Sequence, residues 1–155
     1  MPGLGLGRDP ERTPMQWNSS QNAGFCIPGV EPWLPIPTDY RQLNVAVERE
    51  DSHSMLTLTH ALIALHRSTP ALNGGSYQPI TSVADDCFVY LRQSGSQGYL
   101  VVLNFSDHEQ VLELPAIGKG HIVLSTYLDR EDFSDLTTFR LRGNEGCIIE
   151  IADVH

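Results

Sequence analysis

The stretch CFVYLRQSGSQGYLVVLN, residues 87–104, decides the fold of this chain. Its two apolar runs, residues 87–92 and 99–104, flank the connection SGSQG at residues 94–98. Runs of this length that are rich in valine and aromatic residues are typical of β-strands, and glycine in a short connection is typical of a hairpin turn. The stretch therefore predicts an antiparallel β-hairpin.

Four more short apolar segments follow the hairpin along the chain. They are residues 110–114, 121–126, 137–142 and 147–151, with turn residues between them. Short strands at such spacing, with no helical stretch between them, argue for an antiparallel β-sandwich. We therefore expect a mainly β chain in which residues 76–155 form a β-sandwich domain.

One amphipathic helix is expected before the strands, over residues 51–69. Its apolar residues recur at helical spacing and form a wide stripe: Met55, Leu56, Leu58, Ala61, Leu62, Ile63 and Leu65. Asp51 or Ser52 is expected to cap the first turn, and Pro70 with the glycines at 74–75 to end the helix. A stripe this wide predicts burial on more than one side.

The first fifty residues differ from the rest in their proline content. They hold Pro2, Pro10, Pro14, Pro28, Pro32, Pro35 and Pro37. Proline fixes φ and lacks a backbone donor, so we expect neither regular helix nor central strand here. Large apolar residues such as Trp17, Phe25 and Trp33 are too frequent for a disordered linker. We expect a long ordered loop that packs against a larger body, most of which is not in this chain.

Charge and composition argue against several classes of protein. The formal net charge of −9 argues against a nucleic-acid-binding protein, because binding to nucleic acid requires clustered lysine and arginine. No apolar run approaches the ~20 residues that cross a bilayer, so we expect no membrane span and a cytoplasmic location. Cys26, Cys87 and Cys147 are far apart and form no CxxC pair. We therefore expect buried thiols, no metal site and no cofactor.

Residues 8–17, RDPERTPMQW, carry a resemblance to a known family. The segment is similar to one in oligo-1,6-glucosidases, other α-glucosidases and trehalose synthases of the α-amylase family, glycoside hydrolase family 13. The resemblance continues in order through NAGF at 22–25, PWLP at 32–35, LIALHR at 62–67 and LVVLNF at 100–105. The whole chain thus resembles the C-terminal part of an α-glucosidase of this family.

The resemblance implies a position within a larger enzyme. In the family, a (β/α)8 barrel of ~250 residues is followed by a β-sandwich domain. Residues 1–69 would be the C-terminal remnant of the barrel, with a loop over the active-site face at 1–50 and the last barrel helix at 51–69. Residues 76–155 would be the C-terminal domain.

The resemblance also implies which chemistry this chain lacks. A retaining glycosidase uses two carboxyl groups ~5–5.5 Å apart, one as nucleophile and one as acid/base. In the family both lie on upstream barrel strands, so no catalytic residue is assigned here. The intact enzyme would act on α-linked glucosides, and this chain alone would be inactive.

Arg12 is the one residue that the resemblance assigns to substrate. It matches the family arginine that reaches the non-reducing-end glucose in the innermost subsite. A guanidinium is a rigid, permanently charged fork that can hold a sugar hydroxyl and a carboxylate together. The alternative is that Arg12 only fixes its loop through ion pairs. Asp9 and Glu11 are interpreted as loop-fixing or solvated charges.

The aromatic residues and two departures from the family pattern concern the same loop. Trp17, Phe25 and Trp33 are expected to be packing anchors, with sugar-stacking platforms as the alternative. Asn18 stands where aspartate is frequent, and Cys26 where serine or threonine is usual. Both departures bear on the fine specificity for substrate and not on membership of the family.

Three other functions compete with the glucosidase hypothesis. The first is a trehalose synthase fragment, although the PWLP spacing is more like the glucosidases. The second is a non-catalytic interaction module, like the heavy chains of membrane amino-acid transporters. The third is a stand-alone carbohydrate-binding β-domain. Under the leading hypothesis the missing barrel is the main partner, and without it the exposed loop and helix stripe would promote self-association.

Overall fold

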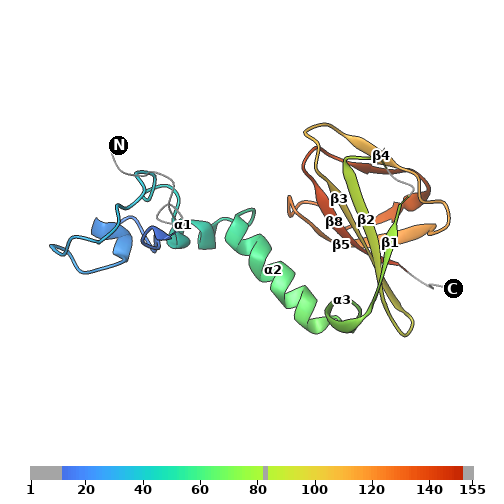
Figure 1. The fold of residues 1–155 in the computed structure, drawn as a ribbon, viewed down its shortest axis with the longest axis horizontal. Helices are drawn as coiled ribbons and strands as arrows, with labels where there is room; N and C mark the ends of the chain where they lie inside the picture. Colours follow the sequence, from blue (N-terminus) through green and yellow to red (C-terminus); the bar gives the residue numbers. More distant parts are fainter. Residues whose placement is uncertain (1–11, 82–83, 152–155) are drawn as a thin grey trace. The chain divides into compact units, whose positions relative to one another are not determined.

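The computed structural model describes residues 12–81 and 84–151 (Figure 1). The chain divides into two compact units, Met1–Thr57 and Leu58–His155. The first unit contains a short 3-10 segment, η2 (Gln21–Gly24), and one short helix, α1 (Val45–Glu50). Most of the other described residues before residue 55 form turns and irregular loop.

Helix α1 corrects the prediction that residues 1–50 contain no regular helix. Its N-cap is Asn44, whose side chain accepts a hydrogen bond from the Val47 N–H at 3.0 Å. Asparagine at this position satisfies one of the free donors of the first turn. Pro37 is the last proline before residue 70, so the segment after it is free to coil.

Helix α2 (Met55–Ser68) lies within the predicted range of 51–69 but begins later. The predicted caps are wrong: the Thr57 N–H is accepted by Ser54 at 3.1 Å, and Asp51 instead accepts the His53 N–H at 2.8 Å. Pro70 opens a further short helix, α3 (Pro70–Gly74), which was not predicted. Proline suits this place because its missing N–H would have no partner in a first turn.

The second unit contains a six-stranded sheet and a two-stranded sheet. The large sheet has the order β1 (Ser76–Ile80), β2 (Cys87–Ser94), β3 (Gln97–Asn104), β8 (Gly146–Ile151), β5 (Lys119–Ser125), β6 (Phe133–Asp135). The small sheet pairs β4 (Gln110–Leu112) with β7 (Phe139–Leu141), and a 3-10 turn, η3 (Leu136–Thr138), precedes β7. Every strand pair is antiparallel, which confirms the mainly β prediction.

The hairpin predicted from residues 87–104 is present as β2 and β3. The two strands pair from Cys87↔Asn104 to Ser94↔Gln97. Gly95 in the connection has φ of 59°, the left-handed conformation that a two-residue hairpin turn requires of its first position. The actual turn is therefore tighter than the five residues, 94–98, expected from the sequence.

The hydrophobic core lies between the two sheets. It is formed by alternate residues of the large sheet and by the inner residues of β4, η3 and β7: Cys87, Val89, Leu91, Leu100, Val102, Leu112, Leu114, Ile122, Leu136, Phe139, Leu141, Cys147, Ile149 and Ile151. Cys87 and Cys147 are free buried thiols, as small hydrophobic residues would be.

A buried carboxylate holds the connection between β7 and β8. The Glu145 side chain is fully buried and accepts hydrogen bonds from Arg142 Nη2 at 2.6 Å and from the Arg142 N–H at 2.8 Å. Arg130 lies 3.3 Å away, and Asp129 accepts two further bonds from Arg142. Burial favours the neutral acid, but the hydrogen bonds from Arg142 outweigh it and lower the pKa of Glu145.

Candidate functional site

Arg12, the one predicted substrate residue, is an exposed side chain at the edge of the described residues. Arg8, Asp9 and Glu11 lie outside the described residues. Two positions after Arg12 the chain turns inward, because Pro14 is buried. The geometry leaves the guanidinium accessible, and its assignment to substrate stays a prediction.

The segment that follows Arg12 is held on two sides at Trp17. The Trp17 N–H donates to the Ala23 carbonyl at 2.9 Å, and the Trp17 carbonyl accepts from the Ala46 N–H at 3.1 Å. The Gln16 carbonyl accepts from the Val45 N–H at 2.9 Å. These two carbonyls therefore satisfy donors of the first turn of α1, which have no partner within the helix.

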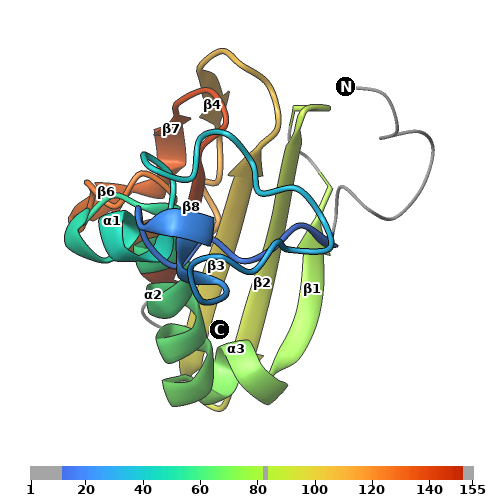
Figure 2. The ribbon, with the colours of Figure 1, turned by 90° about the vertical axis from the view of Figure 1, so that its left-hand side faces the viewer.

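The Gln16 side chain adds a third attachment to the same segment. Its amide donates to the Leu43 carbonyl at 2.7 Å and to Asp39 Oδ1 at 3.2 Å. The residues before α1 are thus tied to the segment by side chain as well as by backbone. Figure 2 shows η2 in blue and α1 in teal, the two elements that this segment joins.

The carbonyl that receives the Trp17 N–H belongs to a strained turn. Asn22, Ala23 and Gly24 have φ of 58°, 54° and 68°, all in the left-handed region. A non-glycine residue there costs about 1–2 kcal/mol, less for asparagine than for alanine. Ala23 is fully buried, its N–H donates to Ser20, and its carbonyl accepts from both Trp17 and Asn18. These contacts hold the alanine in an unfavourable conformation.

Side chains of the turn complete the network. Asn22 donates to the Val30 carbonyl at 2.7 Å and to the Ile27 carbonyl at 3.3 Å, and lies 3.2 Å from Cys26 Sγ. Gly24 has φ of 68°, which favours glycine, and a Cβ there would also displace the Asn18 side chain, whose Nδ2 would lie 2.6 Å away. Asn18 and Cys26, the two departures from the family pattern, therefore both belong to this hydrogen-bonded turn.

The aromatic residues of the loop are exposed. Trp17, Phe25 and Trp33 have exposed fractions of 49%, 50% and 86%. None of the three is buried by the described residues, so none is a packing anchor within this part of the chain. Their exposure fits contact with a body outside this chain or with sugar.

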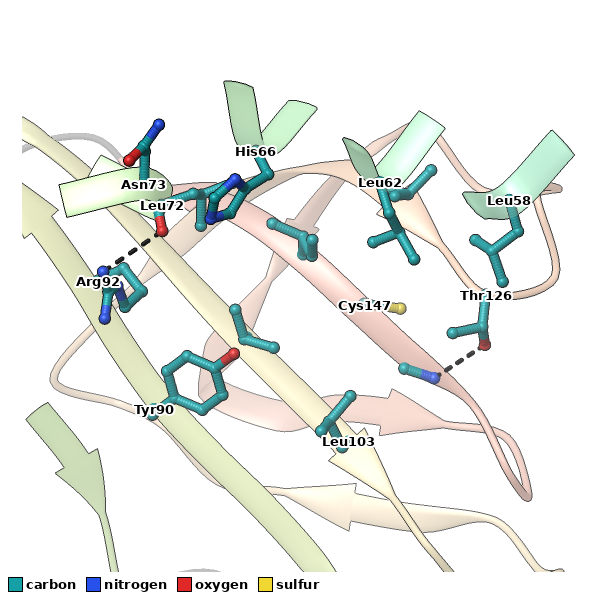
Figure 3. Close-up of a pocket in the computed structure, with 14 residues that line it drawn as sticks. Leu58, Leu62, His66, Leu72, Asn73, Tyr90, Arg92, Leu103, Thr126 and Cys147 are labelled. Atoms are coloured by element: carbon teal, nitrogen blue, oxygen red, sulfur yellow. Dashed lines mark hydrogen bonds between the residues drawn. The ribbon is translucent and has the colours of Figure 1, made fainter. Parts of the chain in front are cut away.

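A separate hollow lies in the second unit, between α2, α3 and the outer face of the large sheet. Figure 3 shows Leu58, Leu62 and His66 of α2 opposite Tyr90, Leu103 and Cys147 of the sheet. Its volume is about 590 Å³. Its lining contains no aspartate or glutamate among the described residues, and Arg92 is engaged with the carbonyls of Ala71 and Leu72. The hollow therefore lacks the carboxyl pair of a glycosidase.

The described parts of the chain offer no site for a metal ion. Residues 12–81 and 84–151 contain no cluster of three histidine, cysteine or carboxylate side chains that could hold an ion. No helix within the same ranges is long and apolar enough to cross a bilayer. Burial, aided by the nearby Glu145, raises the pKa of the Cys147 thiol to about 12, so this thiol remains protonated.

The residues that organise the loop were not singled out from the sequence. Gln16, Ala23 and Asn44 fix it through the contacts above. Two signals were present: the pair Ala-Gly after an asparagine, which marks a turn, and an asparagine just before a helical segment, which marks a cap. The hydrogen bond from the Trp17 N–H to the Ala23 carbonyl joins residues six positions apart, and no short sequence pattern indicates it.

Comparison with known proteins identifies relatives over most of the chain. Residues 3–75 match the family described as alpha amylase, catalytic domain. The oligo-1,6-glucosidase of Parageobacillus thermoglucosidasius is 34% identical over 149 residues, which are 94% of this chain and 26% of that protein. The glucan 1,6-alpha-glucosidase of Streptococcus dysgalactiae subsp. equisimilis is 36% identical over 125 residues, 81% of this chain and 23% of that protein.

Solved structures of family members also match over most of the chain. The trehalulose synthase from Pseudomonas mesoacidophila MX-45 has a TM-score of 0.81 and 31% identity, covering 94% of this chain and 26% of that one. The isomaltulose synthase from Klebsiella sp. LX3 has a TM-score of 0.82 and 30% identity, covering 93% of this chain and 26% of that one. The chain spans about a quarter of the length of the relatives it matches.

Proposed function

The chain belongs to the α-amylase family of glycoside hydrolases, and from this membership we propose that it is the C-terminal part of a retaining α-glucosidase. The proposed enzyme hydrolyses α-glucosidic bonds of oligosaccharides. The observation that carries the proposal is the 34% identity to an oligo-1,6-glucosidase over 94% of this chain. The accessible Arg12 within the RTPMQW segment supports it.

The proposal divides the chain between two domains. Residues 1–69 belong to the catalytic barrel and residues 76–155 to a C-terminal β-sandwich domain. In support, the match to the catalytic-domain family ends at residue 75, between α3 and β1. The nucleophile and the acid/base belong to the part of the enzyme outside this chain, so residues 1–155 alone have no glucosidase activity.

Arg12 positions the sugar in this proposal. Its exposed guanidinium donates hydrogen bonds to a hydroxyl of the terminal glucosyl unit and to a neighbouring carboxylate. Such contacts lower the barrier by orienting the reacting bond. A cytoplasmic location is also part of the proposal, and the free thiols Cys26, Cys87 and Cys147 suit a reducing compartment.

The principal partner in this proposal is the rest of the catalytic barrel. Large apolar side chains of the first unit are exposed, among them Ile27 at 72% and Trp33 at 86%. On α2, only Leu58 is buried, while Met55 and Ile63 are exposed at 69% and 46%. Exposed apolar groups in such number mark an interface, and a catalytic domain is the body that the family match supplies.

The test uses the full-length protein encoded by the reading frame that contains residues 1–155. Purified wild-type protein should release glucose from isomaltose or maltose with retention at the anomeric carbon, which ¹H NMR of the first product detects. Arg12→Ala should lower kcat/KM by about 10²-fold or more, because it removes a charged hydrogen-bond donor to substrate. Arg140→Ala, which alters an exposed arginine of the C-terminal unit, is the control. Absence of glucose release from both sugars would overturn the proposal.

A second candidate is isomerisation of a disaccharide, which the solved structures favour. These structures are of a trehalulose synthase and an isomaltulose synthase, at 31% and 30% identity. Incubation of the same full-length protein with sucrose separates the two reactions. An isomeric disaccharide as the main product would identify an isomerase, whereas glucose and fructose in equal amounts would identify a hydrolase.

A further inference from the structure

We infer that Asn22 and Ala23 are positioning residues for Arg12. The left-handed turn that they form clamps the Arg12–Trp17 segment and so fixes the guanidinium before sugar binds. The inference rests on the proposed function for what Arg12 contacts. The clamp itself rests on the hydrogen bonds and backbone angles of the first unit.

The clamp consists of hydrogen bonds on two sides of the Trp17 backbone. On one side the Ala23 carbonyl accepts the N–H groups of Trp17 and Asn18, at 2.9 and 3.2 Å. On the other side the Ala46 N–H, in the first turn of α1, donates to the Trp17 carbonyl at 3.1 Å. Trp17 is thus paired through both its backbone groups and cannot shift without breaking bonds to two separate elements.

The path from Trp17 back to Arg12 is short and stiff. Pro14 fixes its own φ and is buried, which anchors the middle of the path. Thr13 precedes proline, which restricts it to extended conformations. The Gln16 side chain adds a bond of 2.7 Å to the Leu43 carbonyl. A displacement at Trp17 therefore moves Arg12, and a fixed Trp17 limits its range.

The strain in the turn indicates a role beyond closing a loop. Left-handed alanine persists only where its surroundings over-determine it, and such residues cluster at ligand sites. Ala23 meets this condition because it is fully buried and paired at both its backbone N–H and its carbonyl. Asn22 holds the turn from outside through Val30 and Ile27. Ordering the loop before binding removes an entropic cost from substrate capture.

The first experiment measures hydrogen exchange in the full-length protein, by mass spectrometry of a peptide covering residues 13–20. Ala23→Val places a β-branched side chain at a buried position with φ of 54°, a conformation that such side chains disfavour, and Asn22→Ala removes the outer bonds. Each should speed exchange in this peptide by about tenfold or more. Asn144→Val is the matched control, since Asn144 has φ of 55° but lies in the C-terminal unit. Unchanged exchange in both loop variants would overturn the clamp.

The second experiment measures kcat and KM of the same variants on isomaltose. Loss of the clamp should raise KM about tenfold, because a mobile Arg12 holds the glucosyl unit less tightly, and it should also lower kcat, because Arg12 orients the reacting bond. A merely structural turn would lower the amount of folded enzyme, and hence kcat, while leaving KM unchanged. That result would overturn the inference.

A double variant shows whether the turn acts through Arg12. With Arg12→Ala already present, Ala23→Val should have little further effect on KM, because residues that act through one contact are not additive. Additive effects would overturn the inference. A wild-type protein without glucosidase activity would overturn the proposed function, whereas the exchange experiment would still decide whether the turn clamps residues 12–17.

Discussion

At the residue scale, Glu145 shows how one buried charge is retained. Its carboxylate has no exposed surface and is bound by Arg142, with Arg130 beside it. A charge removed from water is expensive unless its hydrogen bonds are all made. Here Arg142, Arg130, the Ser125 hydroxyl and a backbone N–H make them, which ties the β7–β8 connection to the end of β5 and to Arg130.

Removal of this carboxylate should destabilise the C-terminal unit strongly. Glu145→Ala removes the hydrogen bonds from Arg142 and Arg130, although Arg142 keeps Asp129 as a partner, and we expect a loss of about 2–3 kcal/mol in the free energy of unfolding. Urea denaturation followed by circular dichroism measures it. The matched control is Glu109→Ala, because Glu109 pairs with Arg140 at 2.6 Å on the exposed surface. Its loss should stay below about 1 kcal/mol; equal losses would contradict the argument.

The same residue predicts a dependence of stability on pH. The pKa of Glu145 is lowered in the folded state, because hydrogen bonds from Arg142 outweigh its burial. A depressed pKa contributes stability above the ordinary value of 4.5, and this contribution is lost as the pH falls through the lower, folded pKa. The free energy of unfolding should therefore decline below about pH 4.5 in the wild type. Glu145→Gln should show a shallower decline, and an identical decline would contradict the assignment.

At the element scale, strand β7 joins the small sheet to the core. Phe139 in this strand is 2% exposed and lies among the core residues of the large sheet. Truncation of a buried phenylalanine removes its burial and leaves a cavity, so Phe139→Ala should cost about 3–5 kcal/mol.

Phe133 provides the matched control for that truncation. It lies on the edge strand β6 and is 81% exposed, although its ring contacts His121. Phe133→Ala should change the unfolding free energy by less than about 1 kcal/mol. If thermal and urea denaturation gave equal losses for the two variants, the position of the core between the sheets would be wrong.

The elements differ in how far the sequence determines them. The strands β2, β3 and β8 were predicted because they are rich in buried apolar residues. The edge strands β1 and β6 were missed, since β1 reads SYQPI with no buried residue and β6 has three residues. Edge strands have one partner and little burial, so their sequences carry little pattern.

The loop site was predictable in part. Arg12 was assigned through the RTPMQW segment, whereas NAGF at residues 22–25 was noted as a family motif and not as a turn. The left-handed Ala23 could not be foreseen, because alanine disfavours that conformation locally. Its conformation is imposed by pairing with Trp17 and Asn18, contacts between residues that only the folded loop brings together.

At the scale of the whole molecule, the two units differ in how completely they bury their apolar residues. The C-terminal unit has a closed core of fourteen buried residues. In the described part of the first unit, Ala23 is buried, but the larger apolar residues Met15, Ile27 and Trp33 are exposed. A unit of this kind relies on contacts outside itself for stability.

This imbalance predicts self-association of the 155-residue chain when it is produced alone. The exposed apolar residues of the loop, led by Ile27 and Trp33, form the contact. Sedimentation velocity should show a concentration-dependent increase in mean mass, and the double variant Ile27→Ser/Trp33→Ser should shift the association midpoint to about tenfold higher concentration or beyond. Phe133→Ser, an equally exposed aromatic of the C-terminal unit, should leave the midpoint in place. A chain that stays monomeric throughout would show that the loop satisfies its own apolar surface, and the need for a barrel partner would lose its physical basis.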